Sequence, residues 1–271
     1  MNGVLNEHSL DTLCAALCYA IGIEPPAHAA APSPELMAYV DAAFGGKKAD
    51  RLLMFNPDAV AEWLFEKYPP FFGGLGGEGD LKLPLRTAMP SVTPVCFGTM
   101  YTGAQPAVHG ITKYEKRLIE IDSFFDACVR AGKKVALVSH PRCSMGVIFL
   151  EREIDYFLYP SWEKINAKAA ELIVKDEYDV IVVYNGNYDG VMHKTGTESC
   201  EALAELRANV HAFKWLDEMV AECWQGHNTL LGFAMDHGCH DIDGDAGSHG
   251  LDMVEDLNIL HVYRARPKET E

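Results

Sequence analysis

The sequence lacks the features that mark secreted and membrane proteins. Its eight cysteines form no Cys-x-x-Cys pair and no regular disulfide spacing, so we interpret them as reduced thiols. The apolar stretch at 13–23 has no basic residues before it and is shorter than the ~20 residues that span a bilayer. We therefore expect a cytoplasmic protein with no membrane segment.

Basic side chains are scarce as well. The chain carries 23 Lys and Arg against 39 Asp and Glu, a formal net charge of -16, and no basic stripe stands out along it. A nucleic-acid duplex would be repelled by this charge, which excludes that class of partner. An anionic small molecule would bind only where bound cations reverse the local field.

Internal repeats, low-complexity tracts and a phosphate-binding loop are also missing. The glycine-rich stretch at 68–84 is not followed by the Lys-Ser/Thr pair of a phosphate loop. Its prolines and glycines break any periodicity, which favours a flexible lid or a plain surface loop.

Apolar runs alternate along the chain with segments of helical spacing. This alternation is typical of a parallel sheet covered on both faces, so we predict an α/β fold with a doubly wound, mostly parallel sheet. At 48% hydrophobic residues, the chain can form one large domain over 1–271, with 1–48 as a helical segment packed on the core. The expected strands are 51–56, 133–140, 178–187, 229–237 and 257–265, and the expected helices are 9–22, 34–44, 57–68, 93–103, 115–131, 161–175 and 198–224.

Acidic and histidine side chains follow the predicted strands, where ligands of parallel sheets bind. Taken singly, an Asp there is usually a helix cap or turn residue, and a lone His is usually a satisfied polar group. Together they suit a borderline divalent metal such as zinc or manganese. The candidate ligands are Asp58, Asp189, His193, Asp236, His237 and, just beyond, His249.

A threonine in the stretch "PSVTP" is the candidate nucleophile. Thr93 precedes Pro94, which suits the first position of a helix over 93–103, so Thr93 would lie at a helix N-terminus that favours anions. A metal lowers the pKa of bound water and should act on a coordinated alcohol in the same direction. Without metal ligands nearby, Thr93 would be a simple cap.

With these residues assembled, the sequence resembles the alkaline phosphatase superfamily, in particular its type I phosphodiesterase/nucleotide pyrophosphatase-like branch. The matching motifs occur in family order. They are Asp58, "PSVTP" with the following "TG..P..HGI", the Asp-x-x-x-His of Asp189 and His193, "DHG" at 236–238 and "GSHG" at 247–250.

The resemblance implies two metal sites and a covalent mechanism. One metal would be held by Asp189, His193 and His249, and the other by Asp58, Asp236, His237 and the Thr93 oxygen. Zinc is the implied metal, with manganese as the alternative. Thr93 would attack phosphorus to form a phospho-threonine, and water would release it. The implied activity is hydrolysis of small-molecule phosphate esters, with diesters favoured.

The sequence also departs from the family pattern. Only eleven residues separate His237 from His249, so we expect the cap domain of many relatives to be absent from this place. Substrate selection would then fall to Phe71 and Phe72 in the glycine-rich loop, or to the second subunit of a homodimer. The Asn that relatives place after "HGI" is missing here, which leaves Lys113, Tyr114 and Lys194 as candidate contacts of a phosphoryl oxygen.

Alternative functions remain open at this point. A phosphomutase or a phosphonate hydrolase could use the same core, and so could a non-catalytic metal-binding relative. A calcium loop at Asp241, Asp243 and Asp245 would need Gly and Glu where Ala246 and Asp252 stand. A sulfatase is disfavoured because Thr93 lies in no Cys/Ser-x-Pro-x-Arg signature.

Overall fold

The computed structural model describes residues 3–269 and is organised around a seven-stranded sheet of order β2-β9-β6-β1-β5-β3-β4. Five neighbouring strands, from β6 to β4, pair in parallel, whereas β9 pairs antiparallel with both β6 and β2. The strands are β1 (Arg51–Pro57), β2 (Leu81–Arg86), β3 (Val135–Ser139), β4 (Asp155–Leu158), β5 (Val180–Asn185), β6 (Thr229–Phe233) and β9 (Asn258–Arg266), with a separate hairpin of β7 (His240–Ile242) and β8 (Ala246–Ser248).

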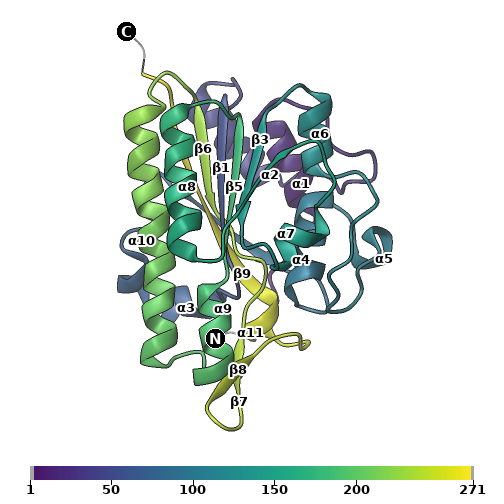
Figure 1. Cartoon of the computed structure of the whole chain (residues 1–271), viewed down its shortest axis with the longest axis vertical. Helices are drawn as coiled ribbons and strands as arrows, with labels where there is room; N and C mark the ends of the chain where they lie inside the picture. Colours follow the sequence, from purple (N-terminus) through teal and green to yellow (C-terminus); the bar gives the residue numbers. More distant parts are fainter. Residues whose placement is uncertain (1–2, 270–271) are drawn as a thin grey trace.

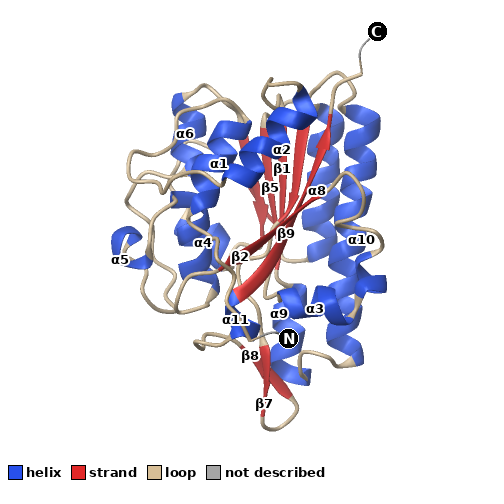
Figure 2. Ribbon diagram, turned by 180° about the vertical axis from the view of Figure 1, so that it is seen from behind, coloured by secondary structure: helices blue, strands red, loops and turns tan. Residues whose placement is uncertain are grey.

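Helices lie on both faces of this sheet. The two long helices α8 and α10 cover one face, and α1, α2 and α6 lie on the other (Figures 1 and 2). This arrangement confirms the predicted α/β fold with a mostly parallel sheet between helices. The helices are α1 (Thr12–Ala20), α2 (Pro34–Phe44), α3 (Glu62–Lys67), η1 (Pro69–Phe72), α4 (Thr93–Thr102), α5 (Pro106–His109), α6 (Phe124–Arg130), α7 (Ser144–Ile148), α8 (Trp162–Lys175), α9 (Asn187–Thr195), α10 (Cys200–Cys223) and α11 (Val254–Leu257).

The burial of the strands explains which of them the sequence could predict. Strands β3, β5 and β6 are buried along their whole length, which gives the continuous apolar runs expected of a doubly covered sheet. Strand β2 alternates exposed and buried residues and pairs only with β9, so it is an edge strand that accommodates Pro84. The predicted loop at 68–84 therefore ends earlier than expected, at the start of β2.

Two predicted helices are shorter in the structure. The helix expected at 115–131 is formed only over Phe124–Arg130, and the one expected at 57–68 begins at Glu62. The turn that delays α3 includes Ala59 at a φ of 62°, a left-handed conformation that is unusual for alanine. Strand β4 was not predicted, because its half-buried residues show no clear pattern.

The N-terminal helices are part of the main core. Buried side chains of α1 and α2 belong to the same hydrophobic cluster as those of the sheet, and α1 packs on α4 and α6. Among residues 3–269, no helix is both long and apolar enough to cross a bilayer.

Gly103 illustrates how tightly α1 and α4 approach each other. It ends α4 at a φ of 69°, and a Cβ there would lie 2.7 Å from the Cβ of Ala29 and 2.9 Å from that of Cys14. Gly132 has nearly the same φ, 70°, but a Cβ added to it would have no neighbouring atom within 4 Å. The two glycines therefore differ in crowding around the Cβ position and not in φ.

We predict that Gly103→Ala destabilises the protein more than its matched control Gly132→Ala. The control carries only the left-handed backbone strain, about 1 kcal/mol, whereas Gly103→Ala adds overpacking for a total of about 2–4 kcal/mol. Urea unfolding of both variants measures the difference. Equal losses of free energy would contradict the tight contact between Gly103 and its neighbours.

His109 is buried between α4 and the turn after α5, at 2% exposure. Its Nδ1 accepts a hydrogen bond from the Ile111 amide at 3.3 Å, and its Nε2 lies 3.1 Å from the Thr99 hydroxyl. Burial lowers the pKa of His109 to about 4, so the ring stays neutral in the folded protein.

We predict a pH-dependent loss of stability from this histidine. Because its folded pKa lies below the ordinary value, its contribution is complete above pH ~6.5 and is lost as the pH falls through about 4, roughly 3 kcal/mol in all. Urea unfolding between about pH 7 and pH 4 should show a smaller acid-dependent loss in His109→Gln than in the natural protein. The same loss in both proteins would mean that His109 is not the titrating group.

Candidate active site

The carboxyl ends of three adjacent central strands bring the predicted site residues together. Asp58 follows β1, Asp236 and His237 follow β6, and α9 starts directly after β5 and carries Asp189 and His193. These strands are neighbours in the sheet, so their ends meet at one edge, near α9 and the β7–β8 hairpin (Figure 1).

A hairpin supplies the remaining histidine. Strands β7 and β8 pair through His240 with Ser248, which turns the chain back so that His249 lies next to the strand ends. Strand β8 packs against α9, the helix of Asp189 and His193.

Two groups of three side chains result, each with ligand atoms within 4.8 Å of one another. One group is Asp189, His193 and His249, and the other is Asp58, Asp236 and His237. These are the two sets that the family resemblance implied from the sequence.

The hydrogen bonds of the three histidines leave the same ring nitrogen available. In each ring Nδ1 lies 2.9 Å from a backbone carbonyl oxygen, that of Gly247 for His193, Gly238 for His237 and Ser91 for His249. A carbonyl only accepts, so each Nδ1 carries a proton and donates it, and Nε2 is the ring nitrogen that faces the carboxylates. Fixing a histidine through its other nitrogen in this way is typical of metal ligands.

The carboxylates have buried oxygens without hydrogen-bond partners in the described chain. These atoms are Asp58 Oδ1, Asp189 Oδ1 and Asp236 Oδ2. Histidine Nε2 atoms lie 3.1 to 3.4 Å from them, at ion-pair distance but without hydrogen-bond geometry. Buried charges of this kind are normally paired or bound to a metal, so the donor set fits a pair of divalent cations.

The set formed by Asp58, Asp236 and His237 is the buried one, and its pKa shifts also indicate an excess of negative charge. Burial and the neighbouring carboxylates raise the pKa of Asp58 and of Asp236 above its ordinary value. Burial would also raise the pKa of Asp189, but the adjacent imidazoles of His193 and His249 outweigh it and lower that pKa. The adjacent Asp189 carboxylate in turn raises the pKa of His193 to about 9.

Thr93 lies beside the buried set, at the first position of α4. It is 4% exposed, and its Oγ1 is 3.5 Å from Asp58 Oδ2 and 3.4 Å from His237 Nε2. Pro94 follows it within the first turn of the ten-residue helix, as predicted. The hydroxyl thus faces both a carboxylate and a histidine of one candidate metal set, at the positive end of a helix dipole.

Supporting contacts of the site were not found from the sequence. The Tyr184 hydroxyl, from the end of β5, donates a hydrogen bond to Asp58, and the Ala59 amide donates to Asp236 Oδ1 at 3.2 Å. Gly238 is required because a Cβ there would lie 2.0 Å from the Glu255 carbonyl oxygen. The Gly in "DHG" gave a signal for this close approach, but Tyr184 gave none.

A cavity of about 580 Å³ opens beside Thr93, Asp58 and Asp189. Its remaining lining was not predicted, except for Tyr114. That lining consists of Tyr114, Lys116, His140, Arg142, Cys143, Ser144, Pro160, Ser161, Trp162, Glu163 and Tyr184.

The other predicted substrate contacts do not line this cavity. Lys113 is 75% exposed beside Glu115, and Lys194 is exposed on α9. Phe72 is buried in a stack with Phe65, and Phe71 stacks on Tyr68. Both rings are held by packing around η1, because burying aromatic surface stabilises the fold, so their predicted role in substrate selection has no supporting contact.

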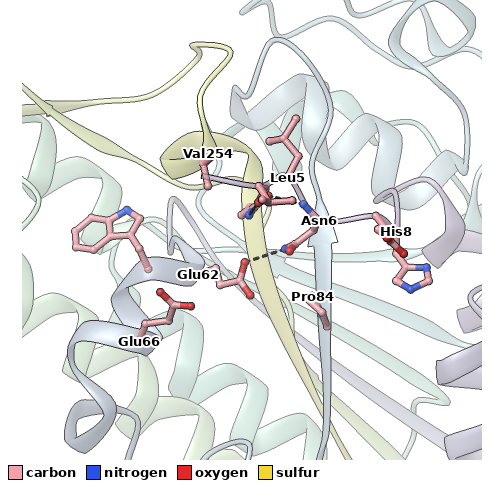
Figure 3. A pocket seen from close by; sticks show the side chains of 11 residues that line it. Leu5, Asn6, His8, Glu62, Glu66, Pro84 and Val254 are labelled. Carbon is pink, nitrogen blue, oxygen red and sulfur yellow. Dashed lines mark hydrogen bonds between the residues drawn. The ribbon is translucent and has the colours of Figure 1, made fainter. Parts of the chain in front are cut away.

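A second cavity, of about 390 Å³, contains none of the predicted site residues (Figure 3). Glu62 and Glu66 of α3 line it together with Glu7, and Asn6 donates a hydrogen bond to Glu62 at 2.8 Å. Its lining is therefore acidic, like most of the surface of a chain with a net charge of -16.

Known structures share the fold described above. Murine ectonucleotide pyrophosphatase/phosphodiesterase 5 is 18% identical, with a TM-score of 0.57 over 72% of this chain and 58% of its own. The human protein of that name is 16% identical, with a TM-score of 0.58 over 71% and 58%. Phosphonoacetate hydrolase from Sinorhizobium meliloti, in complex with phosphonoformate, is 17% identical, with a TM-score of 0.54 over 75% and 61%.

The chain thus spans a little under two thirds of the length of these neighbours. No curated protein sequence matches it. A family model matches residues 52–267, which include both candidate metal sets and Thr93. The chain belongs to the type I phosphodiesterase/nucleotide pyrophosphatase family, within the alkaline phosphatase superfamily.

Proposed function

We propose that the protein is a two-metal hydrolase of phosphate esters that uses Thr93 as its nucleophile. The observation that carries the proposal is the position of the Thr93 hydroxyl, 3.5 Å from Asp58 and 3.4 Å from His237, beside two sets of orphaned carboxylate oxygens and oriented imidazoles. Family membership supports a phosphoester substrate.

Each set has a separate role in holding a cation. Asp189, His193 and His249 would hold one, and Asp58, Asp236 and His237 would hold the other next to Thr93. We propose zinc, with manganese as the alternative, because two carboxylate and imidazole sets suit these metals. Two such cations would lower the pKa of the Thr93 hydroxyl and stabilise the charge on the phosphoryl oxygens.

The chain's own groups then position the reacting atoms. Thr93 Oγ1 gives its proton to solvent and forms a bond to phosphorus, while the bond from phosphorus to the ester oxygen breaks and the departing alkoxide takes up a proton from solvent. Water later cleaves the bond between Thr93 and phosphorus, which releases the phosphate product and returns the hydroxyl. Throughout, the hydrogen bond from Tyr184 holds Asp58, and the start of α4 presents its positive end to the phosphoryl group.

The neighbours support both the nucleophile and the range of substrates. A Thr-to-Ala variant of murine ectonucleotide pyrophosphatase/phosphodiesterase 5 is described as inactive and is in complex with AMP. The bacterial phosphonoacetate hydrolase binds phosphonoacetate in a fold of the same kind. For this chain we propose phosphodiesters as the preferred class, as the family suggests.

We predict that Thr93→Ala lowers kcat for bis-p-nitrophenyl phosphate by at least about 10³-fold, because the nucleophile is lost. Metal content should stay close to that of the natural protein, since both three-residue sets are intact. Turnover is followed at the nitrophenolate absorbance, and metal is measured by mass spectrometry. Thr112→Ala, at an exposed threonine, is the control and should keep full activity. Undiminished turnover in Thr93→Ala would remove Thr93 from the nucleophile role.

We predict that Asp236→Asn lowers both bound metal and rate. The amide keeps the shape of the side chain but removes the charge that holds a cation, and tenfold or greater losses are expected. Asp217→Asn is the matched control, because Asp217 is a buried Asp that pairs with Arg264 and Arg266 outside both metal sets. The control should retain its metal. A fully metallated and active Asp236→Asn protein would disprove the assignment of this ligand.

A further inference from the structure

The cavity beside Thr93 extends well beyond the atoms that react. A phosphoryl group occupies only a small part of about 580 Å³, and the rest of the cavity runs from Asp58 and Asp189 to the loops after β3 and β4. The loop after β3 contributes His140 and Arg142, the start of α8 contributes Trp162, and Lys116 comes from the segment between α5 and α6. A substrate with more than a phosphoryl group would therefore contact these residues.

Two residues of this lining with cationic side chains, Lys116 and Arg142, lie in contact with each other through the Arg142 backbone. The Lys116 ammonium donates a hydrogen bond to the backbone carbonyl of Arg142 at 2.8 Å. The Arg142 amide donates to His140 Nδ1 at 3.1 Å, and the His140 ring packs 6.0 Å from that of Trp162. Burial, followed by the charges of Arg142 and Lys116, lowers the pKa of His140, which agrees with the closeness of the three groups.

Neither cation is neutralised by the protein. Within residues 3–269, no carboxylate forms an ion pair with Lys116 or with Arg142. Glu163, the one carboxylate of the lining besides Asp58 and Asp189, is held by its own backbone amide and by the Ser161 hydroxyl, which lower its pKa. The positive charge of this wall is therefore available to a ligand.

A basic wall is unexpected in this molecule. The chain carries sixteen more acidic than basic charges, and the cavity shown in Figure 3 is lined by three glutamates. Two unpaired cations beside the candidate nucleophile thus run against the general charge of the surface. Such a local reversal favours an anion at this position.

We propose that the substrate carries a second anionic group, a carboxylate or a phosphate, on one of its substituents, and that Lys116 and Arg142 bind this group. The proposal rests on the proposed phosphoester hydrolysis at Thr93, because it describes what is attached to the phosphoryl group. Lys116 and Arg142 determine specificity here and take no part in bond cleavage.

Three small phosphonates test the second anion directly on the metal-loaded protein. Propylphosphonate, 3-phosphonopropanoate and ethane-1,2-diphosphonate share a phosphonate head and differ in a tail that is neutral, a carboxylate or a second phosphonate. Titration calorimetry should show that at least one anionic tail binds about tenfold tighter or more than propylphosphonate, as expected for a charge-assisted contact. The tail that gains more identifies the anion.

Variants locate the effect. Lys116→Gln combined with Arg142→Gln should abolish the preference for the anionic tail and leave the affinity for propylphosphonate unchanged. Both side chains are exposed, so the variant should fold, which a thermal melt checks. Lys164→Gln removes a similar charge near the cavity but outside its lining, and it should keep the preference.

The outcomes separate this inference from the proposed function. Equal affinity for all three phosphonates, or a preference that survives in the double variant, would overturn the second-anion site. Turnover of bis-p-nitrophenyl phosphate is measured on the same preparation. Turnover of the diester without a preference for the anionic tail would reject the second-anion site alone. A preference for the anionic tail, with no turnover of this diester or of any ester that carries a second anion, would support the anion site and reject the proposed hydrolase.

Discussion

Two buried carboxylates and a partly buried third at one point form the constraint around which this structure is organised. Asp58 and Asp236 are almost fully buried, and each has an oxygen with no hydrogen-bond partner, as has Asp189. An uncompensated buried charge costs several kcal/mol, so a fold that retains these groups needs positive charge between them. His237, the ring next to Asp58 and Asp236, cannot supply it, because burial lowers its pKa and favours the neutral form. Divalent cations would satisfy this requirement, and they would also provide the chemistry that the proposed threonine nucleophile needs.

The order of the strands in the sheet brings these charged residues together. Strands β6, β1 and β5 are neighbours, so residues far apart in the sequence reach one edge without long loops. The β7–β8 hairpin returns His249 to the same place, with only eleven residues between it and His237. A rigid buried sheet holds the ligands, while the short connections around it are free to carry the residues that contact the rest of a substrate.

The sequence predicted the parts of this site that depend on strand ends and failed where packing decides. Asp58, Asp189, Asp236 and His237 follow apolar runs, and that pattern together with the family resemblance was enough to group them with Thr93. Tyr184 gave no signal, because a tyrosine inside an apolar strand is equally typical of a core. Phe71 and Phe72 were predicted to contact substrate because they lie in a glycine-rich loop. In the structure both rings are held in aromatic stacks, so their role in substrate selection stays a prediction. Likewise, β2 was missed because its alternating exposed and buried residues follow a glycine-rich stretch that is typical of a loop. Pro84 also argued against a strand, since proline is tolerated there only because β2 lies at the edge of the sheet.

If the proposed anion site is correct, Lys116 and Arg142 would allow an acidic protein to select an anionic substrate. Cations bound at the two candidate metal sets would be compensated by the carboxylates that hold them and would leave little charge for a second anion, whereas the two exposed side chains have no carboxylate partner. Their location on surface loops would separate two tasks, because such loops can change without disturbing the carboxylates at the strand ends. Interactions that bind ground state and transition state alike alter KM more than kcat. Under these two proposals the strand ends would set the chemistry of the site, and loops that can vary independently of them would set the choice of substrate.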